Sequence, residues 1–398
     1  MRPLLSIDEA QRLVLARAVP LGTESVPLAE AAGRFLAEDA VAAVDLPPFD
    51  SSAMDGFAVR SADTPGRLAV VGRIAAGRPA GRPLGPGEAM AIATGGVVPD
   101  GADAVVPIEE VADEGETVEV PGAVASGAHV RPRGGDGAAG SVVAAAGTRL
   151  GPAGLGALAA AGVARVRVGR RPRVAVLSTG TELRLPGERL EPGQIYEANS
   201  VILAAALESA GAQVERLTSV ADDHAEHRAA LEQALTADVV VSSGGVSVGP
   251  HDLVRSIGAA LGVEEVFWGV AMKPGKPVAF GMRGRTLVFG LPGNPVSSLV
   301  GLELFVRPAV LALQGAADPL PRLEPGVLAA PVRRAAVRDE LVRARMRVDG
   351  GDRVLLEPLS GQESHMIARA AAADALVLAP RGEGTLEAGT PVRYLRLG

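Results

Sequence analysis

The chain has 398 residues, of which 47% are hydrophobic and only 3% are aromatic, and its formal net charge is -7 at pH 7. This length is too great for one ordinary core and predicts roughly two to four domains, packed mainly with aliphatic side chains. The negative charge argues against broad nucleic-acid binding. Because the chain has no cysteine, disulfides, thiolate metal sites and a cysteine nucleophile are excluded, and a cytoplasmic protein is expected.

No segment of the sequence predicts a membrane anchor. Residues 1–19 carry charges at Asp8, Glu9, Arg12 and Arg17 and have no uninterrupted apolar core, so they do not predict a signal peptide. The most apolar later stretch, 299–313, contains two charged residues and is too short to span a bilayer.

The first 168 residues predict a β segment inserted into a more helical piece. Ser6 followed by Glu9 is typical of a helix start and predicts a helix over 6–18, and a second short helical region is expected over 24–37. From residue 45 to about 147, short apolar runs broken by Gly and Pro indicate strands. Residues 152–168 then return to a helix and a strand.

The next segment alternates strands with helices, which predicts an α/β sheet covered by helices on both faces. A small β domain is expected after residue 318, where strands and turns return. The expected strands lie at 173–177, 214–217, 238–241, 263–267, 278–280 and 286–289, and the expected helices at 199–210, 224–235 and 297–313.

Only two lysines occur in the chain, Lys273 and Lys276, and both lie in one Pro/Gly-rich turn over 273–277. Arginine supplies every other cation of the Lys+Arg total of 39. Since lysine offers a compact point charge where arginine offers a planar fork, this clustering favours a specific anion-binding role over chance.

Three turns rich in Gly, Ser or Pro each follow a predicted buried strand, at 178–182, 242–249 and 291–295. Ligands of open α/β sheets bind beyond the carboxyl ends of the strands, and exposed amides in glycine turns form anion-binding nests. Ser297 begins the final predicted helix, whose N-terminus also favours an anion. None of the turns has the spacing of a Walker loop or of a dinucleotide-binding motif.

Acidic residues follow these turns or the neighbouring strands, namely Glu182, Asp222, Asp223 and Asp252. Carboxylates beside phosphate-binding turns suit a hydrated Mg²⁺ ion. Solvated loop acids explain the same pattern equally well at this stage. The five histidines show no zinc-ligand spacing.

Taken together, the segments 49–59, 242–252, 273–277 and 291–297 resemble the molybdopterin molybdenumtransferases, the molybdate insertases of molybdenum cofactor synthesis. The resemblance covers essentially the whole chain. It implies a multidomain α/β plus β protein, with a central α/β molybdopterin-binding domain and a C-terminal β-barrel-like domain. The implied domains are an elongated N-terminal domain of residues 1–41 and 137–168, an inserted β domain over 42–136, the α/β domain over 169–317 and the C-terminal β domain over 318–398.

The family reaction converts adenylylated molybdopterin and molybdate into molybdenum cofactor and AMP, with Mg²⁺ or another divalent ion. The resemblance also implies a homodimer whose cleft lies between the α/β domain of one subunit and the inserted domain of the other. The catalytic residues carried over are Asp55, Glu182, Asp252, Lys273 and Lys276, and the metal ligands are Asp222, Asp252 and Glu182. The substrate-binding residues carried over are Thr94, Arg131, Asp136, Ser243, Gly244, Gly245, Pro292, Gly293, Asn294, Ser297 and Arg338.

Three alternatives remain open from the sequence. A molybdopterin adenylyltransferase has the same fold, but it would use only the α/β domain. A non-catalytic scaffold that binds molybdopterin would not need both lysines. Tungstate has nearly the charge and shape of molybdate and is a possible oxyanion. The substrate-delivering partner is expected to be the adenylyltransferase.

Overall fold

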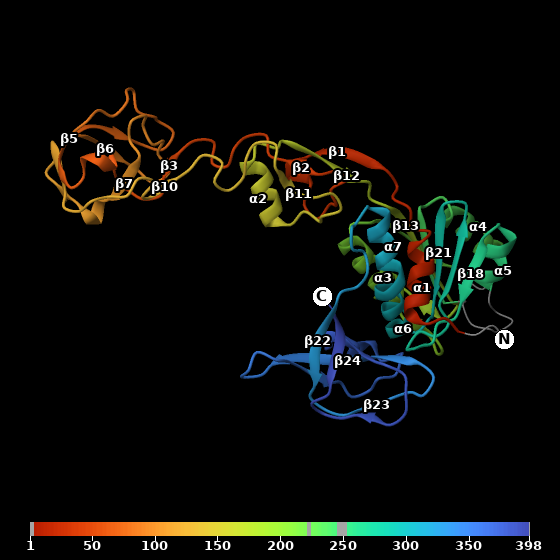
Figure 1. Cartoon of the computed structure of the whole chain (residues 1–398). Helices are drawn as coiled ribbons and strands as arrows, with labels where there is room; N and C mark the ends of the chain where they lie inside the picture. Colours follow the sequence, from red (N-terminus) through yellow and green to blue (C-terminus); the bar gives the residue numbers. More distant parts are fainter. Residues whose placement is uncertain (1–3, 221–223, 245–252, 398) are drawn as a thin grey trace. The chain divides into compact units, whose positions relative to one another are not determined.

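The computed structural model describes residues 4–220, 224–244 and 253–397 (Figure 1). The expected site residues Asp222, Gly245 and Asp252 lie outside these ranges. The chain divides into two compact units, each of which is discontinuous in sequence. The first contains Met1–Glu24, Gly33–Ala37 and Val168–Gly398, and the second contains Ser25–Ala32 and Glu38–Arg167.

The first unit contains the predicted α/β sheet, with strand order β16-β13-β17-β21-β20-β18. The first four strands in this order are parallel, whereas β20 runs antiparallel to both of its neighbours. The alternating pattern of strands and helices in the sequence therefore predicted this architecture correctly. The strands are β13 (Arg173–Thr179), β16 (Gln213–Val220), β17 (Val239–Ser243), β18 (Glu264–Trp268), β20 (Ala279–Arg283) and β21 (Thr286–Leu291).

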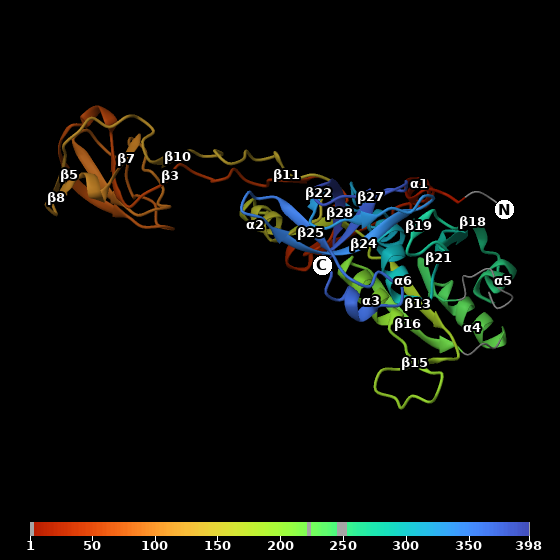
Figure 2. The same ribbon diagram turned by 90° about the horizontal axis from the view of Figure 1, so that it is seen from below.

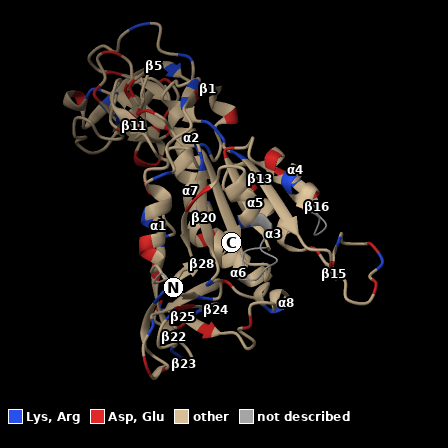
Figure 3. Cartoon of the chain, turned by 90° about the vertical axis from the view of Figure 1, so that its right-hand side faces the viewer, with Lys and Arg blue, Asp and Glu red and all other residues tan. Residues whose placement is uncertain are grey.

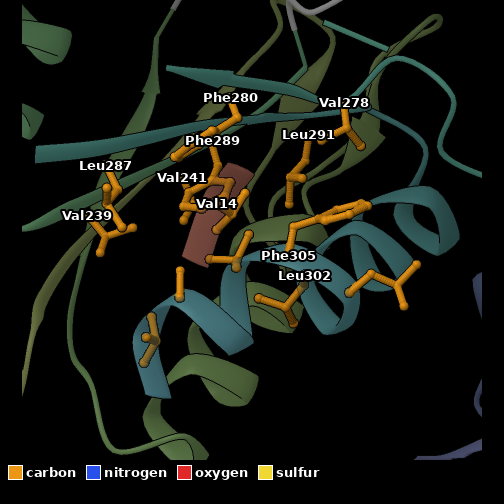
Figure 4. Packing of buried hydrophobic residues seen from close by; sticks show 14 of the residues in the cluster. Val14, Val239, Val241, Val278, Phe280, Leu287, Phe289, Leu291, Leu302 and Phe305 are labelled. Atoms are coloured by element: carbon orange, nitrogen blue, oxygen red, sulfur yellow. The ribbon is translucent and has the colours of Figure 1, made fainter. Parts of the chain in front are cut away.

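Both faces of the sheet are apolar, because the central strands are continuous runs of buried residues. One face presents Val239 and Val241 to a core that also contains Val14 and Phe305, as Figure 4 shows. The other face presents Val240 to a separate cluster. The helices of the first core are α1 (Ile7–Leu15), α3 (Asn199–Ser209), α6 (Pro295–Gly301) and α7 (Arg307–Leu313), and those of the second are α4 (His224–Ala234) and α5 (Leu253–Ala260).

Two helix predictions had opposite outcomes. Helix α1 begins after Ser6, which forms the predicted capping box with Glu9. The predicted helix over 24–37 is wrong: the chain forms strand β1 (Thr23–Pro27) and a short 3₁₀ turn over Leu28–Glu30. Pro27 has no N–H to continue a helix, and the N–H of Leu28 donates to the Ala164 carbonyl instead.

The helical stretch Pro295–Leu313 is longer than the sequence indicated, so its length does not exclude a membrane span. Its residues Leu302–Val306 form a π-helical segment between α6 and α7. In its most apolar part, 78% of the helix is buried inside the protein, so this helix is one of the core helices of the first unit.

The C-terminal strands close into a small barrel, because β24 pairs with β25 on one side and with β26 on the other. The order of pairing is β24-β25-β22-β28-β26, and Leu356, Val377 and Tyr394 lie in its core. Strand β19 (Met272–Lys273), from the lysine turn, pairs with β24 in parallel. The barrel strands are β22 (Leu323–Leu328), β24 (Asp339–Val348), β25 (Val354–Pro358), β26 (Ala375–Ala379) and β28 (Pro391–Arg396).

A long loop between β14 (Leu183–Arg184) and β15 (Ile195–Tyr196) projects from the α/β part of the first unit (Figure 2). The loop contains residues of both charges, among them Glu188, Arg189 and Glu191, and red and blue segments follow each other along it in Figure 3. This loop belongs to the stretch that follows the first glycine turn.

The second unit contains a six-stranded sheet with the order β7-β4-β6-β5-β9-β8 and an apolar cluster on each face. Residues that precede and follow this sheet in the chain form three further pairs, β1 with β12, β2 with β11 and β3 with β10. The sheet strands are β4 (Gly56–Val59), β5 (Gly66–Ile74), β6 (Glu88–Ile92), β7 (Ala104–Pro107), β8 (Ala112–Asp113) and β9 (Thr117–Val120), and the other elements are β2 (Ala40–Val41), β3 (Ser51–Ser52), β10 (Val130–Arg131), β11 (Val142–Ala144) and α2 (Pro152–Ala160). Strand β12 (Arg165–Gly169) begins in the second unit and ends in the first.

Candidate active site

The three glycine-containing turns meet at one edge of the α/β sheet. Strands β13, β17 and β21 are adjacent and parallel, and their register places Ser178, Ser243 and Leu291 side by side. Their carboxyl ends therefore open onto the same edge, which is where open α/β sheets bind ligands. The described residues of the three turns therefore lie close together.

Asn199, at the start of α3, joins two of these turns. Its amide nitrogen donates to the Ser243 hydroxyl and to the Gly293 carbonyl, each at 2.7 Å. The Oδ1 atom of Asn199 is buried and has no partner within the part of the chain that the structure describes. As one of only two asparagines, Asn199 is marked out by the sequence in the same way as the two lysines, but it was not assigned to the site.

Gly244 permits a close approach between two of the turns. Its φ is +93°, and an added Cβ would lie 2.9 Å from the Thr179 carbonyl oxygen. Its N–H donates to the Leu291 carbonyl at 3.1 Å. A glycine is therefore needed at this position for the backbone conformation and for the packing.

Two carboxylates at the first turn, Glu182 within it and Glu197 beside it, have different environments. Glu182 is exposed, and its Oε2 atom lies 2.6 Å from where a Cβ on Gly180 would stand. Glu197 is buried and accepts hydrogen bonds from the Ser178 hydroxyl at 2.9 Å and the Ser200 N–H at 2.8 Å. Glu197, which sequence reasoning missed, therefore links the first turn to the start of α3.

A divalent ion has only partial support from these residues. Over residues 4–220, 224–244 and 253–397, no group of three His, Asp or Glu side chains could hold a metal. Of the three expected metal ligands, only Glu182 lies within the described residues. Its carboxylate is exposed and forms no ion pair with any of them. The donor type fits Mg²⁺, while the complete ligand set stays a prediction.

Both lysines line one pocket of about 520 Å³, here called the lysine pocket. Lys273 ends β19, and Lys276 follows it in the loop that leads to β20. Both lysines are exposed, whereas Ser297, in the first turn of α6, is only 3% exposed. The expected residues that line this pocket are Lys273, Lys276, Pro292, Asn294, Ser297 and Arg338.

The lysine pocket concentrates positive charge in an acidic protein. Lys273, Lys276 and half-buried Arg338 contribute three cations, and the nearby carboxylate of Glu363 is the acidic group on its wall. A local excess of positive charge raises the concentration of anions at such a site. The pocket can therefore bind a compact anion through ammonium groups, a guanidinium group and a serine hydroxyl.

The far wall of the lysine pocket comes from the barrel domain, through Gln362, Glu363, Ser364 and His365. Ser364 anchors this wall to α6, because its hydroxyl accepts from the Asn294 amide at 2.9 Å and its carbonyl accepts from the Val296 N–H at 3.1 Å.

Arg343 fixes the same wall from beneath. This side chain is 2% exposed and donates to the carbonyls of Gly361 at 2.7 Å, Met366 at 3.0 Å and Glu363 at 3.1 Å. Burial lowers the pKa of the Arg343 guanidinium below its ordinary value, while the nearby Glu363 charge opposes this shift. A barrel arginine thus shapes a pocket that opens beside the α/β sheet.

The expected residues of the second unit are only partly brought together. The Thr94 N–H donates to Asp55 Oδ1 at 2.7 Å, so these two residues form one local structure. Arg131 is exposed on β10 opposite Ser51, and the Asp136 side chain is also exposed. Among the described residues, no hydrogen bond or ion pair joins Arg131 or Asp136 to Asp55 or Thr94.

Gly275 offers a test of the lysine loop. We expect Gly275→Ala to lower the stability of the first unit by about 1–3 kcal/mol and to weaken anion binding. Its φ is +97°, and a Cβ would lie 2.7 Å from Met272 Cε and 3.4 Å from the Ser297 carbonyl oxygen. Thermal unfolding and molybdate titration measure the two effects.

Gly262→Ala is the matched control, because Gly262 also has a positive φ, of +83°, but an added Cβ meets nothing within 4 Å. Gly262→Ala should cause backbone strain similar to that of Gly275→Ala but should leave anion binding normal. Equal anion affinity in the two variants would show that the close packing at Gly275 does not shape the pocket.

The comparisons with known proteins agree along the whole chain. Three family models match the chain. The MoeA N-terminal region (domain I and II) matches residues 5–162, a probable molybdopterin binding domain matches 175–312, and the MoeA C-terminal region (domain IV) matches 325–397. A solved molybdopterin biosynthesis MoeA protein from Pyrococcus horikoshii superimposes with a TM-score of 0.84 at 29% identity, covering 99% of this chain and all of that one. Another solved structure, also titled as a molybdopterin biosynthesis MoeA protein from Pyrococcus horikoshii, gives a TM-score of 0.80 at 33% identity, covering 99% of both chains.

Curated relatives are similar over nearly their full length. Molybdopterin molybdenumtransferase 2 of Mycobacterium tuberculosis is 39% identical over 98% of both chains. The molybdopterin molybdenumtransferase of Haemophilus influenzae is 34% identical over 98% of both chains. That of Bacillus subtilis is 35% identical, covering 99% of this chain and 94% of the relative. With these relatives and the matching arrangement of domains, the chain belongs to the molybdopterin molybdenumtransferase (MoeA) family of molybdenum cofactor biosynthesis.

Proposed function

We propose that this protein inserts molybdate into adenylylated molybdopterin and thereby forms molybdenum cofactor and releases AMP. The observation that carries this proposal is the lysine pocket, in which both lysines of the chain meet Ser297 and Arg338. A tetrahedral dianion suits this set, because three cations and a hydroxyl can contact different oxygen atoms. The names of the family relatives support molybdate as the oxyanion.

The three turns at the sheet edge are proposed to hold the organic substrate. Pro292 and Asn294 line the lysine pocket and belong to the third turn, which Asn199 joins to Ser243 of the second turn. A substrate bound along this edge through Ser243, Gly244, Gly245 and Gly293 would place its reacting end next to the anion. Holding both reactants in this way supplies much of the rate enhancement, without a covalent enzyme intermediate.

The proposal assigns Mg²⁺ to Glu182, Asp222 and Asp252. When bound there, such an ion would offset the negative charge of the phosphoanhydride. The protein's own contribution is to orient that group with backbone amides and to hold the oxyanion with the two lysines.

The test is to supply purified protein with adenylylated molybdopterin and to measure AMP release with and without molybdate. Molybdate-dependent release supports insertion. ATP consumption with molybdopterin, independent of molybdate, would instead identify an adenylyltransferase, and neither reaction would identify a binding scaffold. Replacing molybdate by tungstate in the same assay decides between the two oxyanions.

We also propose a cytoplasmic homodimer of four-domain subunits, in which Asp55, Thr94, Arg131 and Asp136 of one subunit complete the site of the other. The expected result is that an inactive Asp55→Ala protein mixed with an inactive Lys276→Ala protein regains up to about a quarter of normal activity, because mixed dimers contain one intact site. Activity after subunit exchange is the measurement. No recovery, despite exchange shown by native mass spectrometry, would contradict a shared site.

A further inference from the structure

Lys273 lines two neighbouring hollows. One is the lysine pocket, and the other, of about 310 Å³, is lined by Lys273, Arg333, Glu340 and Gln362 together with apolar residues. Glu340 lines only the second hollow. The Lys273 ammonium lies 2.8 Å from Glu340 Oε1, so this cation is paired with Glu340.

The backbone fixes this pair in place. Lys273 and Glu340 are register partners in the parallel ladder between β19 and β24, so their Cα atoms are held opposite each other. The Glu340 side chain is 13% exposed, whereas that of Lys273 is 54% exposed. A largely buried carboxylate needs a partner, while a long exposed lysine side chain is free to move. The movable member of the pair is therefore Lys273.

Lys276 differs from Lys273 in this respect. No ion pair of Lys276 is recorded over the described ranges, although it lines the same pocket. The two lysines, three residues apart, are therefore in unequal states before an anion arrives. Lys276 is available at once, whereas Lys273 must first leave a carboxylate.

We propose that Glu340 is a positioning residue that draws the Lys273 ammonium out of the lysine pocket, so that an entering oxyanion must compete with Glu340 for this cation. The inference rests on the proposed function, because it concerns the affinity of the same pocket for molybdate. Glu340 acts through Lys273, without contact to the anion. It lowers the affinity for simple oxyanions, which eases release of the dianion toward the organic substrate.

The experiment is calorimetric titration of molybdate into the full-length protein without pterin. Because partly exposed ion pairs are weak, Glu340→Gln is expected to lower the Kd for molybdate by about two- to five-fold. In a Lys273→Ala background the same Glu340→Gln change should leave the Kd unaltered, because the competition runs through Lys273.

Two controls separate charge from structure. Glu340→Asp keeps the negative charge, so its Kd for molybdate should stay near that of the unaltered protein. If Glu340→Asp and Glu340→Gln lower the Kd equally, the effect does not depend on the charge. Glu357→Gln removes the partner of Arg347 on the barrel surface and should change nothing. The inference is overturned if Glu340→Gln leaves the Kd for molybdate unchanged or raises it. It is also overturned if Glu340→Gln lowers this Kd equally in the Lys273→Ala background. If the unaltered protein binds no molybdate, the proposed function itself fails.

Discussion

Lys276→Ala is expected to reduce molybdate-dependent AMP release by about 100-fold or more while the protein stays folded. Lys276 lies in the lysine pocket, and its ammonium has no recorded ion pair within the described part of the chain. Losing one preorganised charged donor at a site where negative charge is held costs roughly 10²–10³ in rate. Exposed side chains of this kind contribute little to stability, so the thermal midpoint should stay within about 1–2 °C. Single-turnover AMP release at saturating substrate is the measurement.

Two further variants sharpen this test. Lys276→Arg keeps the positive charge but replaces a compact ammonium by a planar fork, so a loss of about ten-fold is expected if geometry matters as well as charge. Arg285→Ala removes an exposed cation from the turn between β20 and β21, outside the lysine pocket, and should retain full activity. Near-normal activity of Lys276→Ala would remove the principal support for the anion role of this pocket.

Much of the α/β part could be predicted from the sequence because its signals are local. Continuous apolar runs such as 173–177 and 238–241 predict buried parallel strands, and a turn after each strand must then lie at the carboxyl edge. The capping box at Ser6 is equally local. The helix expected over 24–37 is wrong because β1 pairs with β12, about 140 residues later in the chain, and the local sequence pattern does not contain this partner.

The residues that sequence reasoning missed act through contacts that are distant in sequence. Glu197 accepts from a serine 19 positions earlier, and Asn199 donates to residues 44 and 94 positions later. Closure of the barrel depends on β24 pairing with two strands, which strand propensity alone does not determine. The pairing of Lys273 with Glu340 follows from the β19–β24 register and is equally hidden in the sequence. The boundaries of the four expected domains stay a prediction.

Arg343 had no place among the predicted site residues, and its replacement should have the largest effect on stability. We expect Arg343→Ala to destabilise the first unit by about 3–5 kcal/mol, because several carbonyls would lose their donor and the deleted side chain would leave a cavity. The apparent thermal midpoint should fall by about 6–12 °C. Since the freed segment carries Ser364 and the wall of the lysine pocket, molybdate affinity should fall too. Differential scanning calorimetry and molybdate titration measure the two effects.

The matched control is Arg345→Ala, two residues further along β24. Its side chain is exposed, and its one hydrogen bond among the described residues is a long one of 3.4 Å to the Ala372 carbonyl. It should shift the midpoint by no more than about 1–2 °C. Arg343→Lys keeps a cation but supplies fewer donors in a different geometry, so it should restore only part of the stability. Hydrogen exchange of amides 361–366 then separates a local from a global effect. If Arg343→Ala leaves these amides as protected as before, the guanidinium does not hold the pocket wall, and the link from the barrel core to the anion site is wrong.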